Sequence, residues 1–347
     1  PWDQQWSLRM QQILAYETDL LEHGDIFDGS REIARKVEAL KEEARAELAT
    51  IDRMGGAVAA IDYMKRRLVE SNSIRLRGIE TGEQVVVGVN RFIETEPSPL
   101  SAGEGTIQTI DPAVESEQVS RLQAWRAARD GKAAAAALAE LERAAREGRN
   151  VMEPSIACAK AGVTTGEWGT TLRRVFGEYR APTGVARAAP ERGGAGLEEV
   201  RGAVEAVSGR LGRRLKLLVG KPGLDGHSNG AEQIAVRARD CGMEVVYEGI
   251  RLTPAQIVRA AVDEAVHVVG LSILSGSHVP LVREVMERMR KEGLDDVPVV
   301  VGGIIPPEDA KVLEGLGVAA VYTPKDFQLN DIMADIVGLA AGLAKAA

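Results

Sequence analysis

The stretch that decides the fold is LKLLVGKPGLDGHSNG, residues 215–230. It begins with a short apolar run ending at Gly220, continues through a glycine-rich loop, and leads into a helix expected to start near Gly230. The same order recurs, with apolar runs at 244–247, 267–272, 297–301 and 319–322 and helices expected to start near Pro254, His278, Pro306 and Gln328. Short strands that alternate with helices predict right-handed crossovers and a parallel sheet covered on both faces. Residues 211–347 are therefore expected to form one α/β domain with five parallel strands.

The composition is that of a globular protein with a sizeable core. The chain has 347 residues, of which 45% are hydrophobic and 27% charged, and its formal net charge is −8. This balance argues against a fibrous chain, and the acidic surplus argues against nucleic acid and anionic membranes as partners. The apolar runs are too short to span a bilayer, and Cys158 and Cys241 are too few for a disulfide framework. We therefore expect a cytoplasmic protein.

The first part of the chain has a mainly helical pattern. Ile33, Val37 and Leu40 recur at spacings of four and three residues, which is typical of an amphipathic helix that packs on another surface. A short strand is expected at residues 84–89. Because the chain opens at Pro1 without an initiator Met, we expect it to be a piece of a longer polypeptide.

The middle of the chain connects this part with the α/β domain. Two or three helices are expected between residues 116 and 180. Residues 181–196 carry two prolines and four glycines, which predicts a linker. The chain is thus expected to divide into a first domain at 1–92, a helical connecting region with a flexible linker at 93–210, and the α/β domain at 211–347.

Loops of the predicted sheet carry the residues that could bind a ligand, because ligands of such sheets bind at the carboxyl ends of the strands. Asp225 stands two residues before His227, so its carboxylate can hold one ring nitrogen and make the other a better metal ligand. Lys221 can bond and balance Asp225. A single histidine cannot make a zinc site, but it suits a metal already held by a macrocycle. Gly302 and Gly303 let the backbone approach a bulky ligand closely.

Other reactive side chains are predicted to be structural. His278 begins a helix and His267 begins a buried strand, and both positions are typical of packed histidines. Cys158 and Cys241 are expected to be small buried hydrophobes. The turn at residues 221–223 lacks the spacing of a phosphate-binding loop.

Together the three loops resemble the signature of the cobalamin-binding domain that takes its cofactor in a base-off, histidine-on form. The matching motifs are Asp225-x-His227-x-x-Gly230, Ser272-x-Leu274 and Gly302-Gly303. The resemblance covers residues 211–347 and implies a flavodoxin-like arrangement of the five-stranded parallel sheet.

The resemblance also implies a role for each residue. His227 is expected to be the lower axial ligand of cobalt, supported through hydrogen bonds by Asp225 and Lys221. The displaced dimethylbenzimidazole tail is expected to run beside the first strand. The remaining residues expected to bind the cofactor are Gly226, Gly230, Ser272, Leu274, Gly302 and Gly303, with Tyr322 and Thr323 closing the pocket.

Segments before the linker resemble the coenzyme A mutases that use adenosylcobalamin. These segments are RMQQIL at 9–14, MGGAVAAI at 54–61, VGVNRF at 87–92 and LRRVFGEYR at 172–180. Within that family, HSNGAEQ at 227–233, LSGSH at 274–278 and YTPKDF at 322–327 are closest to the ethylmalonyl-CoA mutases. The resemblance implies that residues 1–92 are the end of a TIM-type barrel that binds acyl-CoA, that linker helices follow, and that Gln12 contacts the substrate.

The activity implied by this resemblance is an isomerase reaction, the radical rearrangement of ethylmalonyl-CoA to methylsuccinyl-CoA with adenosylcobalamin. Three alternatives stay open: methylmalonyl-CoA mutase, which interconverts methylmalonyl-CoA and succinyl-CoA, a cobalamin-binding module without catalysis, and a flavodoxin-like signalling domain. Because most of the substrate domain is missing, this chain alone is expected to bind cobalamin without turnover. The family also implies a homodimer and a G-protein chaperone that loads the cofactor.

Overall fold

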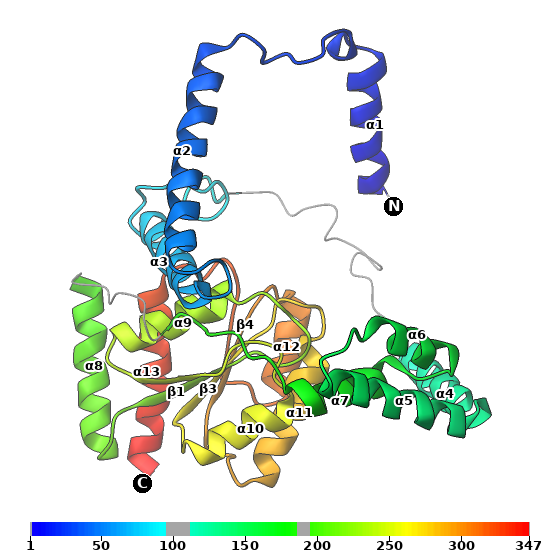
Figure 1. Cartoon of the computed structure of the whole chain (residues 1–347). Coiled ribbons are helices and arrows are strands. Elements are labelled where there is room, and N and C mark those ends of the chain that lie inside the picture. The colour runs from blue at the N-terminus through cyan, green and yellow to red at the C-terminus, as the bar shows by residue number, and fades with distance from the viewer. Residues whose placement is uncertain (1, 95–111, 186–194, 347) are drawn as a thin grey trace. The chain divides into compact units, whose positions relative to one another are not determined.

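The computed structural model describes residues 2–94, 112–185 and 195–346 (Figure 1). It forms two compact units, Pro1–Lys65 and Arg66–Ala347. Most of the predicted linker, residues 186–194, lies outside the described residues. None of the described helices combines the length with the apolar character that a bilayer crossing requires.

The sheet of the second unit has five parallel strands, as predicted. They are β1 (Lys216–Gly220), β2 (Glu244–Tyr247), β3 (Val268–Ser272), β4 (Val299–Gly302) and β5 (Ala320–Tyr322), in the spatial order β2-β1-β3-β4-β5. This is the flavodoxin-like order, in which the direction of chain progression switches between β1 and β3. Register pairs Gly220 with Leu271 and Ser272 with Gly302. The carboxyl ends of the three central strands therefore meet at one edge.

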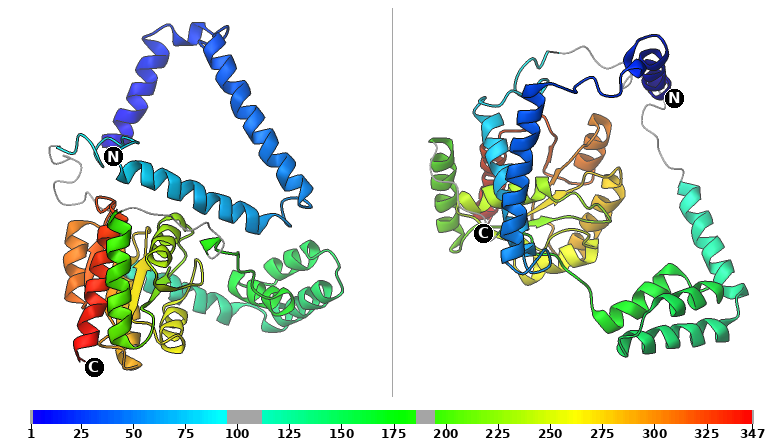
Figure 2. Two further views of the ribbon diagram at one scale, coloured as in Figure 1. Left: turned by 90° about the vertical axis from the view of Figure 1, so that its left-hand side faces the viewer. Right: turned by 45° about the horizontal axis from the view of Figure 1, so that its top comes forward.

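Helices cover both faces of this sheet (Figures 1 and 2). One face packs under α8 (Ala195–Leu211), α9 (Asn229–Asp240) and α13 (Leu329–Ala346), and the other under α10 (Pro254–Asp263), α11 (His278–Lys291) and α12 (Pro307–Gly315). Side chains of β1 alternate between the faces, because Leu217 and Val219 belong to the first core and Leu218 to the second. All three are buried, which explains why the strands are continuous apolar runs.

Local capping signals set the starts of several helices. Thr253 accepts a hydrogen bond from the Gln256 backbone N–H, the Gln256 side chain accepts from the Thr253 backbone, and Pro254 occupies the first turn of α10. The five predicted helix starts of the α/β domain each lie within one residue of the observed ones. They were found because proline and capping residues are local features of the sequence.

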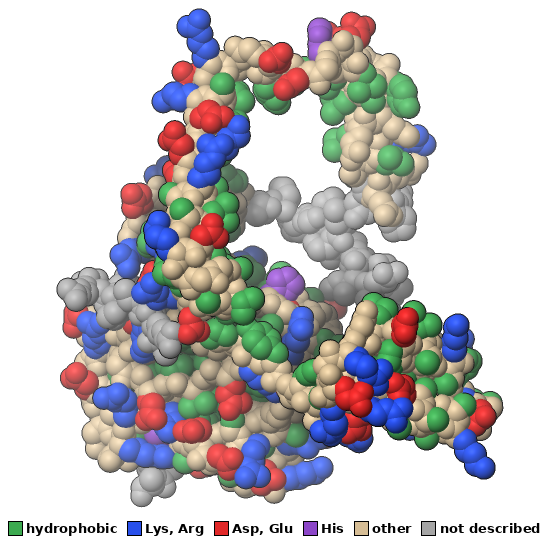
Figure 3. Space-filling model, in the orientation of Figure 1, with side chains coloured by type: hydrophobic (Ala, Val, Ile, Leu, Met, Phe, Trp, Pro, Cys, Tyr) green, Lys and Arg blue, Asp and Glu red, His purple; other side chains and the backbone are tan. Residues whose placement is uncertain are grey.

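The region before the sheet is helical, as predicted. The first unit holds α1 (Trp2–Tyr16), a 3-10 turn at Leu20–Glu22 and α2 (Arg31–Arg53), and α3 (Ile61–Glu80) leads into the second unit. The expected amphipathic helix is present as α2, but none of its residues is buried in the described structure. Its Ile33, Val37 and Leu40 are between 41% and 57% exposed. Figure 3 shows green hydrophobic side chains along the surfaces of α1 and α2.

The strand predicted at residues 84–89 is wrong. The segment forms turns with one isolated bridge, between Val87 and Arg91. Asn90 organises it, because its amide accepts a hydrogen bond from the Val86 backbone N–H at 2.8 Å and donates to the carbonyls of Ile79 and Gln84, both at 2.8 Å. Asparagine side chains compete with strand pairing in this way, and the apolar run alone does not reveal it.

Residues 112–176 form four helices, where two or three were expected. They are α4 (Pro112–Ala128), α5 (Gly131–Arg146), α6 (Met152–Lys160) and α7 (Thr165–Phe176). Asp130 caps α5 and Thr164 caps α7. Gly148 and Gly162 end the preceding helices with φ of 67° and 76°, a conformation that favours glycine. These capping residues and glycines divide segments whose sequence pattern predicts fewer, longer helices.

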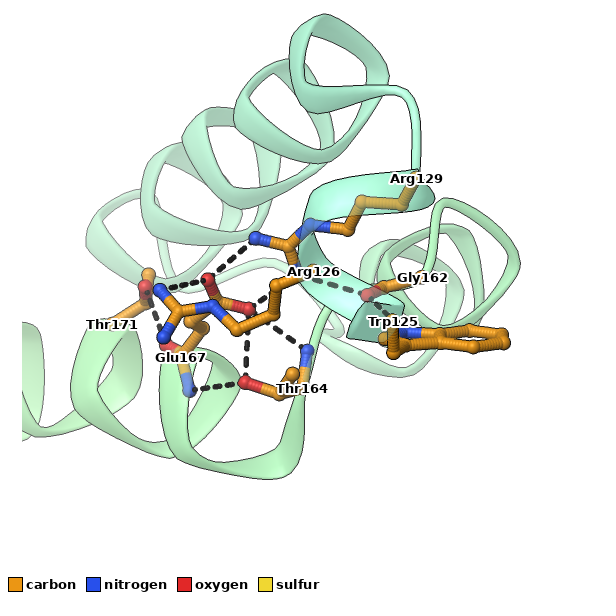
Figure 4. A network of polar contacts seen from close by, with 7 residues as sticks. All are labelled: Trp125, Arg126, Arg129, Gly162, Thr164, Glu167 and Thr171. Carbon is orange, nitrogen blue, oxygen red and sulfur yellow. Dashed lines mark hydrogen bonds and ion pairs between the residues drawn. The ribbon is translucent and has the colours of Figure 1, made fainter. Parts of the chain in front are cut away.

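An ion-pair network ties α4 to α7 (Figure 4). Arg129 donates both terminal nitrogens to Glu167, each at 2.6 Å, and one of them also reaches the carbonyl of Gly162 at 2.9 Å. Trp125 donates its indole N–H to the same carbonyl at 3.0 Å. Glu167 also completes the capping box of α7 by accepting from the Thr164 backbone N–H. The bonds from Arg129 and then from Thr164 hold the pKa of Glu167 well below its usual range.

We expect Glu167→Gln to lower the free energy of unfolding of this helical region by about 1–2 kcal/mol at pH 7. The folded pKa lies below the unfolded value of about 4.3, so the contribution is present above that pH and is lost as the pH falls. The difference between wild type and variant should therefore shrink below about pH 4. Urea unfolding followed by Trp125 and Trp168 fluorescence measures it, with the exposed Glu117→Gln as control. Equal losses in both variants would contradict the network's role.

Candidate functional site

Backbone and side-chain contacts join the loops after β1, β3 and β4 at the carboxyl edge of the sheet. The ammonium of Lys221 donates to the carbonyl of Ser272 at 2.9 Å, which links the first loop to the end of β3. The Leu274 N–H donates to Asp225 at 2.9 Å. The Ile273 N–H donates to the carbonyl of Gly302 at 2.9 Å. Residues that the motifs placed in three separate loops thus lie in one connected site.

Asp225 is the centre of this site. Its Oδ1 accepts from the backbone N–H of His227 at 3.0 Å and lies 2.7 Å from His227 Nδ1. Its Oδ2 accepts from Lys221 Nζ at 3.1 Å and from the Leu274 N–H. Burial by itself raises the pKa of Asp225, but these four hydrogen bonds outweigh it and hold the pKa well below the usual range. Asp225 is therefore a carboxylate at neutral pH.

His227 has one ring nitrogen fixed and the other free. Because the Asp225 carboxylate accepts, Nδ1 is the ring nitrogen that donates to it, and in the neutral imidazole the lone pair then lies on Nε2. The side chain is 78% exposed, so Nε2 can reach a metal in a bulky cofactor. Across the described ranges, no group of three or more His, Cys, Asp or Glu side chains is placed to hold a metal ion by itself. The geometry therefore suits a metal that takes one ligand, His227, from the protein and its other ligands from a cofactor.

Lys221 is completely buried at the end of β1. Burial lowers its pKa, and the hydrogen bond to Asp225 opposes that change. Its ammonium contacts the Asp225 carboxylate and the Ser272 carbonyl. The side chain therefore links the first loop to the end of β3.

An apolar cavity of about 390 Å³ lies beside these loops. Leu217 and Val219 of β1 line it. Its lining also contains seven of the residues predicted to bind the cofactor, which are Gly230, Ser272, Leu274, Gly302, Gly303, Tyr322 and Thr323. The hydroxyl of Tyr322 is buried, and burial raises its pKa above the usual range, with Asp335 nearby adding to the effect. The cavity lies beside the first strand, and its apolar walls fit an aromatic group.

Two of the predicted residues lie outside this lining and outside the hydrogen bonds described so far. Gly226 is exposed between Asp225 and His227. Gln12 lies on α1 in the first unit, where its side chain accepts a hydrogen bond from Arg9 at 2.6 Å. Their roles stay predictions.

The motifs missed a second wall of the cavity. Leu76 and Ile79 of α3, with Val86 and Val89 from the turn after it, also line the cavity. They come from a part of the sequence that was assigned to another domain. The spacing of Leu76 and Ile79 shows an apolar helix face, but it does not show which surface that face meets.

Glu80 holds this wall in place. Its carboxylate accepts from Arg237 of α9 at 2.9 Å and from the backbone N–H of Leu329, the first residue of α13, also at 2.9 Å. The side chains of Glu80 and Arg237 are only 11% and 7% exposed. Gln233 of α9 adds a bond to the Val69 carbonyl at 3.1 Å. α3 is therefore tied to two helices of the α/β domain.

Comparison with models of protein families shows the family to which the chain belongs. Residues 4–178 match the family model described as methylmalonyl-CoA mutase. The chain belongs to the methylmalonyl-CoA mutase family. Residues 215–326 match the B12 binding domain, which contains every residue of the edge described above. The prediction of a cobalamin-binding α/β domain in an acyl-CoA mutase is thereby confirmed, and cobalamin is its cofactor.

Two ethylmalonyl-CoA mutases are among the relatives in this family. The enzyme of Cereibacter sphaeroides is 68% identical over all 347 residues, which cover 53% of its length. That of Methylorubrum extorquens is 61% identical over 98% of this chain and 49% of its own. A methylmalonyl-CoA mutase of Cereibacter sphaeroides is 36% identical over 90% of this chain and 44% of its own. The chain therefore spans about half the length of the relatives it matches.

Proposed function

We propose that this chain is the cobalamin-binding part of an adenosylcobalamin-dependent mutase that rearranges ethylmalonyl-CoA to methylsuccinyl-CoA. The observation that carries the cofactor role is the arrangement of Lys221, Asp225 and His227 beside an apolar cavity. When bound, adenosylcobalamin supplies the cobalt and the radical chemistry of the rearrangement. The protein supplies binding, orientation and exclusion of water.

Each residue of the site has a role in holding the cofactor. His227 would offer Nε2 as a ligand to the cobalt, and Asp225 fixes the imidazole through Nδ1. Lys221 keeps Asp225 charged and in place. The apolar cavity would take the base of the cofactor, and Tyr322, which lines the cavity, would contact that tail. In this proposal His227 is a ligand and transfers no proton.

The identity of the substrate is supported by the relatives. Two ethylmalonyl-CoA mutases are 68% and 61% identical to this chain, whereas the methylmalonyl-CoA mutase is 36% identical. The second candidate is therefore methylmalonyl-CoA, and turnover of both acyl-CoAs by the intact polypeptide distinguishes the two. The proposal includes the substrate contact of Gln12 and the division at residues 92 and 210.

Resemblance to the family also supports a homodimer, a G-protein chaperone that loads the cofactor, and a cytoplasmic location. Size-exclusion chromatography with light scattering tests the first of these. The chaperone is tested by the rate at which cobalamin loads with and without it.

We expect His227→Ala to remove the histidine-bound absorption spectrum of adenosylcobalamin that the wild-type chain produces. The alanine has no nitrogen to offer to cobalt, while the fold stays intact because the His227 side chain is 78% exposed. Titration with the cofactor, followed by visible absorption, measures both the spectrum and the dissociation constant. His23→Ala, an exposed histidine in the first unit, is the matched control. An unchanged spectrum in His227→Ala would contradict the ligand role.

A further inference from the structure

A second histidine lies at the same edge of the sheet. His278 is the first residue of α11 and is buried. Its Nε2 lies 2.7 Å from a carboxylate oxygen of Asp309, in the first turn of α12. Because a carboxylate accepts, the ring donates this bond through Nε2. The carbonyl of Ser275 lies 3.4 Å from the other ring nitrogen.

This pair, the His278–Asp309 clasp, joins two loops that carry residues predicted to bind the cofactor. The loop from β3 to α11 contains Leu274 and ends at His278. The loop from β4 to α12 contains Gly303 and ends at Pro306, three residues before Asp309. At the strand ends the two loops are already joined, because the Ile273 N–H donates to the Gly302 carbonyl. The clasp joins the same two loops at their other ends, where α11 and α12 begin.

The clasped loop reaches His227 through two hydrogen bonds. Leu274, four residues before His278, donates its backbone N–H to Asp225 at 2.9 Å. Asp225 in turn lies 2.7 Å from His227 Nδ1. A shift of the loop removes one of the four hydrogen bonds that fix the carboxylate, and the carboxylate fixes the imidazole.

We propose that His278 and Asp309 are positioning residues for the cofactor: their clasp holds the loop at residues 274–277 so that Leu274 fixes Asp225 and Asp225 fixes the metal-binding orientation of His227. This inference rests on the proposed cobalamin function. It gives a role to a histidine whose place in the sequence indicated only the start of a helix.

The test is a titration of the full chain with adenosylcobalamin, followed by visible absorption. His278→Ala and Asp309→Ala are each expected to bind about tenfold more weakly, and to hold a smaller fraction of the saturating cofactor in the histidine-bound form. The double variant should be no weaker than the single ones, because both break one interaction. Asp309→Asn keeps an acceptor for Nε2 and should restore most of the binding.

His267→Ala separates positioning from general stability. His267 is also buried, but it lies at the opposite end of the sheet, where its Nδ1 accepts from the Lys216 backbone N–H at 2.9 Å. This control should lower the melting temperature and leave the spectrum of the bound cofactor unchanged. If His278→Ala behaves like His267→Ala, the clasp is only structural and the inference is wrong. If the wild-type chain binds no cobalamin, the proposed function fails, and this inference fails with it.

Discussion

Asp225→Ala is expected to lower the free energy of unfolding of the α/β domain by about 3–5 kcal/mol, because it leaves a charged partner buried and uncompensated. The carboxylate accepts four hydrogen bonds, and Lys221 is completely buried beside it. Without Asp225, the ammonium keeps the Ser272 carbonyl but loses the only carboxylate shown to hydrogen-bond to it, and Glu232 acts on it only through its charge. The variant should also lose cobalamin binding, since nothing then orients His227. Urea unfolding followed by circular dichroism measures the first effect, and absorption titration the second.

A double variant, Lys221→Met with Asp225→Ala, tests whether the buried charge is the cause. Removing both partners of a buried pair is often close to neutral, so this variant should regain much of the lost stability. It should not regain cobalamin binding. Glu264→Ala is the matched control, because Glu264 pairs with Lys216 at 2.9 Å but is about half exposed at the other end of the sheet. A single Asp225→Ala variant as stable as this control would show that the buried pair contributes nothing.

Gly303→Ala is expected to cost about 3 kcal/mol of unfolding free energy, at the upper end of the range for overpacked positions. A Cβ at this position would overlap the carbonyl oxygen of Ile273 and lie 2.9 Å from its carbonyl carbon. Both are backbone atoms, so no side chain can rotate away. The loops after β3 and β4 must separate, and this also moves Leu274 away from Asp225. Thermal and urea unfolding measure the loss.

The neighbouring Gly302→Ala is the control for that prediction. A Cβ there meets nothing within 4 Å, so the unfolding free energy should change by less than about 0.5 kcal/mol. Gly302 lines the apolar cavity, however, and the added methyl group should weaken cobalamin binding. Equal stability losses in the two variants would contradict the close approach at Gly303. Unchanged binding in Gly302→Ala would contradict the placement of the cofactor tail.

The elements that the sequence revealed are those set by neighbours in the chain. The five strands are short apolar runs because helices cover both faces of the sheet, and residues such as Thr253 and Pro254 mark helix starts locally. The link between Asp225 and His227 was found because it spans two residues. The division of the chain at residues 92 and 210 stays a prediction.

What the sequence did not reveal depends on contacts between distant residues. Glu80 meets Arg237 across 157 positions, and no local pattern in either segment indicates the other. Asp309 meets His278 across 31 positions, for the same reason. The turn at 84–90 was read as a strand because its apolar run hides the hydrogen bonds of Asn90.

Because α3 supplies a wall of the apolar cavity, the residues that form this cavity extend beyond the segment that contains the sheet. The segment from residue 211 onward contains all five strands and reads as a complete domain. If it were cut out at the linker, the cavity would lose Leu76, Ile79, Val86 and Val89, and its apolar lining would open to water. We therefore expect a fragment that begins at residue 211 to bind the cofactor more weakly than the compact unit Arg66–Ala347, which keeps these four side chains. Measurements of cofactor affinity on the excised domain would therefore describe a cavity that lacks one of its walls.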